Sequence, residues 1–184
     1  KALAGLFAGE YDVGIFPWST VFKHMTARGE TLKVYASGDF RPTLPVEALV
    51  VPVKSRIKDV TGLKRMKVGY PPQLRDYFAP FLIGANLPTE LVTGVELPLS
   101  ELVSRLEAGE VDVAWLVEPL ICTLDSTKLR VLETGALPKY VSAPCTGVAV
   151  GFSPEFLEKG KALLSRLKIS TDAAIVVVDS RPER

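Results

Sequence analysis

Two similar segments lie far apart in this chain, and this repeat limits the folds that the chain can adopt. Residues 6–19, LFAGEYDVGIFPWS, are matched by residues 106–119, LEAGEVDVAWLVEP, with six identities at a constant offset of 100 positions. Each copy has the pattern of a helix end, a glycine suited to a left-handed conformation, an acidic turn and a short apolar strand. The offset is longer than the ~20–50 residues of solenoid repeats. The repeat therefore predicts two similar lobes.

The composition is that of an ordinary globular protein. Of 184 residues, 47% are hydrophobic and 23% are charged. The net charge of +1 gives no reason to expect nucleic acid or an anionic membrane as a partner, so any partner recognised by charge has to be recognised locally. The longest apolar runs, 173–178 and 148–152, fall far short of the ~20 residues of a membrane span. The first residues do not resemble a secretion signal.

No catalytic, metal or cofactor motif is present. The sequence contains no phosphate-binding glycine loop, GxSxG, HExxH or CxxC. His24 stands alone in a predicted helix, which makes it a poor catalytic or metal candidate. Cys122 and Cys145 lack metal-ligand spacing and are predicted to be two buried thiols, with a disulfide as the alternative.

Apolar runs and turn residues predict alternating strands and helices. The predicted strands are 11–16, 32–37, 47–53, 67–70, 95–97, 111–116, 129–134 and 145–152. The predicted helices are 2–8, 20–27, 71–85 with a kink at Pro80, 100–108, 154–167 and 171–178, with Ser19, Ser100 and Ser153 as N-caps. Residues 38–42 are predicted to be a loop and 135–144 a connector, and Pro52 is predicted to lie at a sheet edge or a lobe crossing. The alternation indicates an α/β fold with parallel sheets covered by helices on both faces.

Several segments, in order, resemble one family. GEYDVGI at 9–15, LKVYA at 32–36, LVVP at 49–52 and LKRMKVG at 63–69 are similar to solute-binding proteins of ABC importers, of the nitrate, sulfonate, taurine and thiamine-precursor type. The resemblance implies a type II periplasmic-binding fold, with two α/β lobes of mainly parallel sheets joined by two crossing strands. Lobe I would comprise residues 1–52 and 144–184, and lobe II residues 53–143, with hinges near 51–54 and 142–146. The family's first strands and long helix have no counterpart, so the chain is expected to be N-terminally incomplete.

The same resemblance implies a function. The protein would be a periplasmic or extracellular receptor, secreted or lipid-anchored, which captures a small anionic or heterocyclic organic ligand between its lobes. It would present this ligand to ABC permease subunits as a monomer, with no cofactor, metal, nucleic acid or catalytic residue. Two alternatives stay open: a cytoplasmic enzyme on the same fold, resembling menaquinone-pathway or dihydroxyphthalate-decarboxylase-like proteins, and the effector-sensing domain of a transcription regulator.

Ligands of open α/β sheets bind beyond the carboxyl ends of the strands, near helix N-termini. This rule selects eight candidate ligand-binding residues: Trp18, Ser19, Thr20, Phe40, Arg41, Tyr70, Gln73 and Glu118.

Most of these candidates also have a structural interpretation. Arg41 would clamp a sulfonate or carboxylate, or is a surface charge. The three aromatic residues would enclose an organic ligand, or cover the sheet edge. Ser19 would cap a helix and touch the ligand as well. Glu118, if it faces the cleft, disfavours a purely anionic ligand and suits an amine or heterocycle; otherwise it begins a helix. Asp12 and Asp112 are predicted to form turns.

Overall fold

The computed structural model describes residues 2–43 and 45–180, without the side chains of 161 and 177–179. The chain divides into two compact units. Unit 1 comprises residues 1–37 and 148–184, and unit 2 comprises residues 38–147. Two strands, β2 (Lys33–Phe40) and β8 (Cys145–Phe152), run from one unit into the other.

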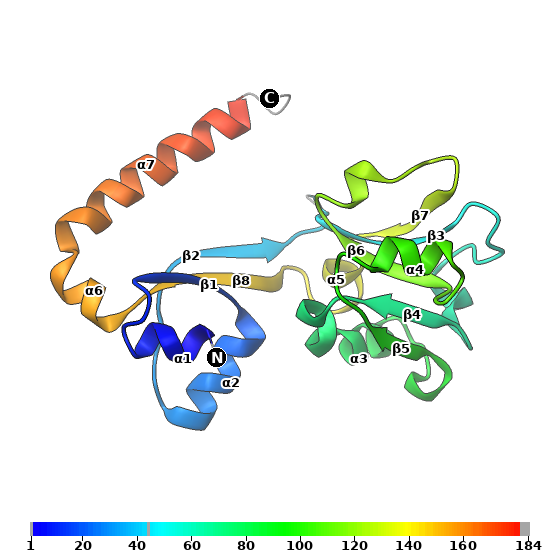
Figure 1. Ribbon diagram of the computed structural model, residues 1–184, viewed down its shortest axis with the longest axis horizontal. Helices are drawn as coiled ribbons and strands as arrows, with labels where there is room; N and C mark the ends of the chain where they lie inside the picture. Colours follow the sequence, from blue (N-terminus) through cyan, green and yellow to red (C-terminus); the bar gives the residue numbers. More distant parts are fainter. Residues whose placement is uncertain (1, 44, 181–184) are drawn as a thin grey trace. The chain divides into compact units, whose positions relative to one another are not determined.

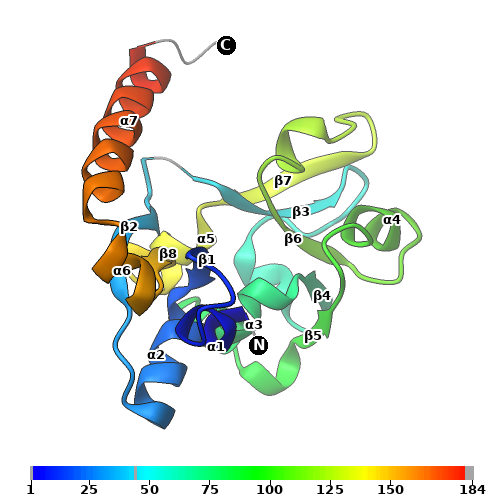
Figure 2. The same cartoon turned by 60° about the vertical axis from the view of Figure 1, so that its left-hand side comes forward.

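Unit 1 is built on a three-stranded sheet of order β1-β8-β2, where β1 is Val13–Pro17. Helices α1 (Ala2–Phe7) and α2 (Trp18–Arg28) pack on this sheet through a small core that includes Leu6, Phe16 and Val21. Figures 1 and 2 show α1 and α2 together on one side of the sheet. Helices α6 (Pro154–Lys159) and α7 (Lys161–Ser180) follow β8.

Unit 2 is built on a five-stranded sheet of order β5-β4-β6-β3-β7. Its strands are β3 (Glu47–Pro52), β4 (Lys67–Tyr70), β5 (Thr93–Glu96), β6 (Val113–Val117) and β7 (Leu129–Thr134). Its helices are α3 (Arg75–Gly84), α4 (Leu102–Glu107) and α5 (Ala136–Tyr140), with short 3-10 turns η1 (Val60–Leu63), η2 (Pro72–Leu74), η3 (Thr89–Leu91) and η4 (Ile121–Thr123).

The two central strands of unit 2 alternate between two cores. On β3, Leu49 faces a core with α3 and α5, whereas Val50 faces a core with α4. On β6, Trp115 faces the core with α3 and α5, and Leu116 faces the core with α4. Because side chains alternate along a strand with a period of two, these apolar runs are buried on both faces. Unit 2 is therefore a sheet covered by helices on both faces, as predicted (Figure 1).

The repeat corresponds to the same local structure in each unit. Helix α1 leads through Gly9, with φ +76°, into β1, and α4 leads through Gly109, with φ +74°, into β6. In both copies the glycine N–H and the following glutamate N–H donate to carbonyls of the last helical turn, which is a Schellman motif. The predicted sequence of helix, left-handed glycine and strand is confirmed in both places.

The predicted strand directions are wrong in part. Strand β4 is parallel to β5 and β6, but β3 is antiparallel to β6 and β7, and β1 is antiparallel to β8. For β3, an apolar strand buried on both faces carries no sequence signal for its direction, which explains the error there. The sheet edge predicted for Pro52 is also wrong, since β3 lies between β6 and β7. The alternative position, a crossing between lobes, does not match the two units either, because residues 38–147 form one unit. Pro52 is tolerated because the pairing with β6 ends at Val50.

Several predicted helix ends and loops also need correction. Helix α2 begins at Trp18 after Pro17, and α4 begins at Leu102, so neither Ser19 nor Ser100 is an N-cap. Strand β2 continues to Phe40, the 135–144 connector contains α5, and a break at Gly160 separates α6 from α7. Helix α3 continues through Pro80.

Other local predictions are confirmed. Ser153 caps α6, and residues 171–178 lie in α7. Both cysteines are free; Cys145 is buried, but Cys122 is exposed, contrary to expectation.

Residues 38–52, expected in lobe I, belong to unit 2, because β3 pairs with β6 and β7 there. Residues 51–54, expected to form a hinge, therefore lie inside unit 2 and not at the boundary between the units.

Candidate functional site

The strand ends of unit 2 define a candidate binding edge. Parallel strands β4, β5 and β6 end there at Tyr70, Glu96 and Val117. Strand β3 begins at the same edge, because Glu47 pairs with Val117, and β7 ends there, because Thr134 pairs with Ala48. We call this the carboxyl edge of unit 2. Open α/β sheets bind ligands at such an edge.

Tyr70 forms an aromatic pair at the carboxyl edge. Its ring stacks on Phe78 of α3 with a centroid distance of 4.6 Å. Gly94 on the neighbouring strand makes room for the pair, since a Cβ there would lie 2.6 Å from the Phe78 ring and 2.9 Å from the Tyr70 ring. Burial raises the pKa of the Tyr70 phenol, so the hydroxyl stays protonated and able to donate at neutral pH.

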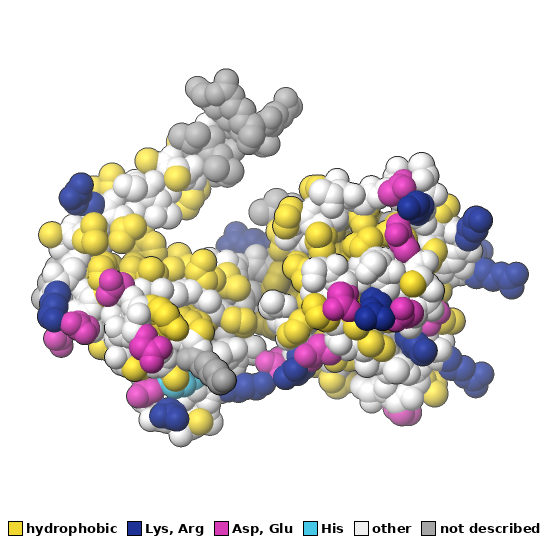
Figure 3. All heavy atoms as spheres, viewed as in Figure 1, with side chains coloured by type: hydrophobic (Ala, Val, Ile, Leu, Met, Phe, Trp, Pro, Cys, Tyr) yellow, Lys and Arg dark blue, Asp and Glu magenta, His cyan; other side chains and the backbone are white. Residues whose placement is uncertain are grey.

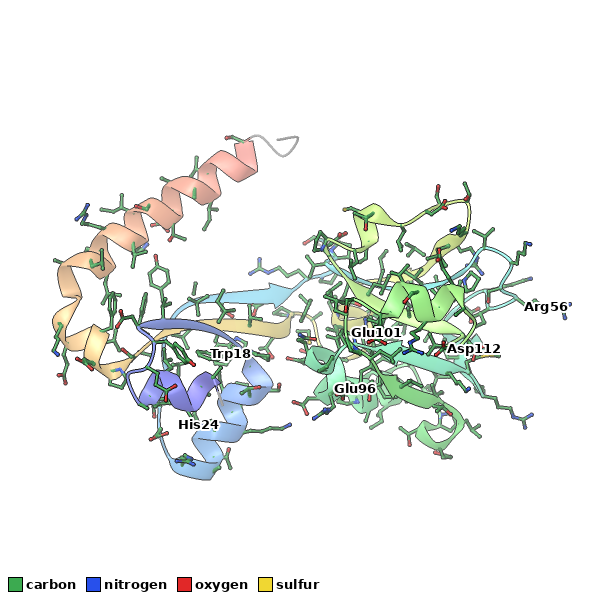
Figure 4. All side chains as sticks on the ribbon, viewed as in Figure 1. Trp18, His24, Arg56, Glu96, Glu101 and Asp112 are labelled. Carbon is green, nitrogen blue, oxygen red and sulfur yellow. The ribbon has the colours of Figure 1, made fainter. Side chains whose placement is uncertain are left out.

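An ion pair that the sequence analysis missed lies beside Tyr70. Arg75, the first residue of α3, donates to both carboxylate oxygens of Glu96, with Nε–Oε2 and Nη2–Oε1 distances of 2.5 Å. The pair lowers the pKa of Glu96 and raises that of Arg75. Figure 4 marks the position of Glu96 at the end of β5. In the sequence, Glu96 ends one strand and Arg75 follows another, and nothing indicated that the two charges meet. Gln73, in η2 between β4 and α3, is exposed.

Phe40 is the last residue of β2 and Arg41 follows it, both in unit 2. The Phe40 ring lies edge-to-face with Tyr77 of α3 at 6.5 Å between centroids, and the Tyr77 hydroxyl donates to the Thr146 carbonyl at 2.6 Å. Gly147 permits this approach, because a Cβ there would lie 3.1 Å from the Phe40 ring. Arg41 is exposed and makes no ion pair with another residue that the structure describes. It is therefore a cation available to a ligand.

Glu118, at the end of β6, turns toward its own loop. Its Oε2 accepts from the backbone N–H of Cys122 at 3.3 Å, and its proximity raises the pKa of the Cys122 thiol. The carboxylate thus satisfies a donor of the η4 turn.

The three candidates in unit 1 lie at the start of α2. The Trp18 indole donates to Ser37 Oγ at 3.1 Å and stacks on Phe22 at 5.2 Å, so its ring is held in place by its own unit. Ser19 is half-buried and Thr20 is exposed. Figure 4 shows Trp18 and His24 on this unit; His24 stacks on Phe7 and pairs with Glu30. Three candidates therefore lie in unit 1 and five in unit 2.

A buried carboxyl group, also missed from sequence, supports the carboxyl edge. Glu47 is 1% exposed; its Oε2 accepts from Trp115 Nε1 at 2.6 Å and its Oε1 accepts from the Leu137 N–H at 2.9 Å. Burial raises the pKa of Glu47, although both hydrogen bonds oppose the shift. The side chain joins the start of β3 to β6 and α5. It therefore fixes the strand and helix from which the loops of the carboxyl edge extend.

Solved structures similar to this chain include periplasmic binding proteins. The aliphatic sulphonate binding protein SsuA from Escherichia coli matches 99% of this chain with a TM-score of 0.75 and 22% identity. The alkanesulfonate-binding protein SsuA from Xanthomonas axonopodis pv. citri, solved with MOPS, matches 98% with a TM-score of 0.69 and 18% identity. This chain shares their α/β fold.

The match has limits that bear on function. The chain spans 61% of the length of each of these two proteins and 47% of a putative sulfonate-binding protein from Methylobacillus flagellatus KT, which matches with a TM-score of 0.62 and 16% identity. No family model and no curated protein matches the sequence. The matched structures named here are binding proteins rather than enzymes. Within the described part of the chain, no helix is both long and apolar enough to cross a membrane.

Proposed function

We propose that this chain belongs to an extracytoplasmic solute-binding protein that captures a small organic anion for an ABC importer. The observation that carries this proposal is the fold shared with two sulfonate-binding proteins along almost the whole chain. The carboxyl edge supports it with the aromatic face of Tyr70, and Arg41 is an exposed cation of the same unit. Small-molecule sites are commonly built from apolar walls and a few polar anchors.

In this proposal the two units are lobes that close on the ligand. Strands β2 and β8, which continue from one unit to the other, would be the hinge, and closure would depend on contacts that only the closed form makes. Trp18, Ser19 and Thr20 would contact the ligand from one lobe, and the other five candidates from the second. The closed monomer would be the form that permease subunits recognise at the membrane.

The ligand proposed first is an organic sulfonate or carboxylate, with a heterocycle second. Arg41 can hold two anionic oxygens at once, and one oxygen of Glu118 is engaged by the backbone of its own loop. Tyr70 supplies a protonated hydroxyl and an aromatic face.

Isothermal titration of the complete protein tests this proposal with ethanesulfonate, taurine, nitrate and an aminopyrimidine. We expect ethanesulfonate to bind, and Arg41→Gln to weaken binding by about tenfold or more, because a hydrogen-bonded charge contributes ~1.5–3 kcal/mol. Arg166→Gln, an exposed arginine of α7, is the matched control and should not change the affinity. Absence of heat with all four compounds would refute the ligand classes and leave the fold unaffected.

A further inference from the structure

Positive charge is concentrated in one segment of unit 2. Residues 54–67, KSRIKDVTGLKRMK, contain six Lys or Arg and one Asp, in a chain whose net charge is only +1. We call the six cations the basic strip: Lys54, Arg56, Lys58, Lys64, Arg65 and Lys67. All six are exposed. The remainder of the chain is therefore net negative, and the positive charge of the protein is local.

Salt bridges occupy six cations elsewhere in the described part of the chain but none of the basic strip. Arg75, Arg105, Lys128, Lys139, Lys159 and Lys168 each form a salt bridge. No member of the strip forms one with any residue in the described ranges. The nearby acids are engaged elsewhere: Asp59 accepts from the backbone and hydroxyl of Thr61, Asp112 accepts from the Lys67 backbone N–H, and Glu107 pairs with Lys128.

The strip lies at the end of unit 2 remote from the carboxyl edge, where β3 ends and β4 begins. There Lys54 and Arg56 border a hollow of about 360 Å³ with apolar walls that include Met66 and Val111. Arg130 fixes the loop by donating to the carbonyls of Ser55 and Ile57. In Figure 3, Lys and Arg side chains project from this end of unit 2, and Figure 4 shows Arg56 pointing away from the ribbon, with Asp112 nearer the sheet.

We propose that the basic strip binds the anionic headgroups of a phospholipid membrane. Each Lys or Arg close to an anionic membrane surface contributes roughly a fivefold gain in affinity, and residues 54–67 present six of them. Val53, 43% exposed, supplies an apolar side chain beside Lys54 that can enter the interfacial layer. The strip would hold the protein close to the bilayer, with the carboxyl edge at the other end of unit 2 left open.

The composition of the strip favours lipid over a macromolecular partner. Protein interfaces are enriched in aromatic residues and depleted in Lys, yet residues 53–67 contain no Phe, Tyr or Trp and four Lys. Single-stranded nucleic acid is bound largely by stacking on aromatic rings, which this segment lacks. Exposed, unpaired, flexible cations suit a fluid anionic surface that needs no fixed geometry.

Vesicle co-sedimentation of the complete protein tests the proposal independently of any solute. We expect binding to phosphatidylglycerol-containing vesicles and none to pure phosphatidylcholine, with loss of binding at about 1 M salt, where the Debye length falls to ~3 Å. Lys54→Gln/Arg56→Gln/Lys58→Gln should weaken vesicle binding by about 100-fold. The control Arg28→Gln/Lys33→Gln/Arg166→Gln removes the same charge from exposed positions of unit 1 and should weaken it far less.

Three results would overturn the proposal. They are equal binding to both vesicle types, equal losses in the two triple variants, and binding of soluble polyglutamate or single-stranded DNA through the strip without vesicle binding. Matching circular dichroism and melting temperatures of the two variants ensure that folding is not the cause. Because the assay contains no solute, failed vesicle binding leaves the proposed receptor function standing, and failed solute binding leaves the membrane proposal standing.

Discussion

At the scale of single residues, the buried carboxyl group of Glu47 joins β3 to β6 and α5 within unit 2. A glutamine at this position has one acceptor oxygen for two donors, Trp115 Nε1 and the Leu137 N–H, so its amide group would face one of them. We expect Glu47→Gln to reduce the free energy of unfolding by about 1–3 kcal/mol, as measured by urea unfolding. Glu158→Gln, at an exposed position of α6, is the control and should change it by less than ~0.5 kcal/mol.

The effect of Glu47 should also depend on pH. Its folded pKa is raised by burial, so the folded protein holds the proton more tightly than the unfolded chain does. The contribution of Glu47 is therefore greatest below the unfolded pKa of ~4.3 and declines as pH rises through the folded pKa. The stability difference between wild type and Glu47→Gln should fall across that window. A difference that rose with pH would contradict the raised pKa.

Sequence reasoning identified residues whose roles are local and missed those whose partners are distant. Ser153 was predicted because Ser, Pro and Glu at 153–155 are a helix start within one turn. Glu47 bonds side chains and backbone 68 and 90 positions away, and Arg75 meets Glu96 across 21 positions. Sequence patterns indicate the helix or strand propensity of a segment, but they do not indicate contacts between residues this far apart. For Glu118 the pattern predicted the position at a strand end, whereas the direction of the carboxylate needed the fold.

At the scale of elements, the start of α6 offers a direct test of capping. Ser153 is buried and its Oγ accepts from the Phe156 N–H at 3.1 Å. We expect Ser153→Ala to lower the free energy of unfolding by about 1 kcal/mol, because one N–H of the first helical turn loses its acceptor. Chemical unfolding monitored by circular dichroism measures the change.

Ser100→Ala is the matched control for this cap. Ser100 is exposed and precedes Glu101, which is the N-cap position of α4, so its hydroxyl caps nothing. Its replacement should change stability by less than ~0.5 kcal/mol. Equal losses at the two serines would show that the Ser153 hydrogen bond does not stabilise α6.

Helices, turns and strands were predicted well where neighbouring residues determine them. Strand directions were predicted poorly, because they depend on the neighbouring strands of the sheet. The two copies of the repeat each formed a helix, a left-handed glycine and a strand, since this sequence is set by a few neighbouring residues. The direction of β3 depends on which strands lie beside it, and its apolar run reads the same in either direction. The net charge of the whole chain likewise gave no indication of the basic strip, because acidic residues elsewhere offset its positive charge.

At the scale of the whole molecule, burial is uneven between the two units. Strands β3 and β6 carry Leu49, Val50, Val113 and Trp115 with no exposed side-chain surface. Helix α7 instead leaves apolar residues in solvent, with Ile169 70% and Val176 65% exposed. Helices gain most of their stability from packing an apolar face, so α7 gains less than the strands do.

Hydrogen exchange followed by mass spectrometry should reveal this difference. We expect amides of β3 and β6 to exchange only when unit 2 opens completely, and amides of α7 to exchange at least ~100-fold faster through local fraying. Equal protection of α7 and β3 at every protein concentration would contradict this expectation. Protection of α7 that rises with concentration would mean that its apolar residues pack between copies, because only intermolecular burial is strengthened by mass action.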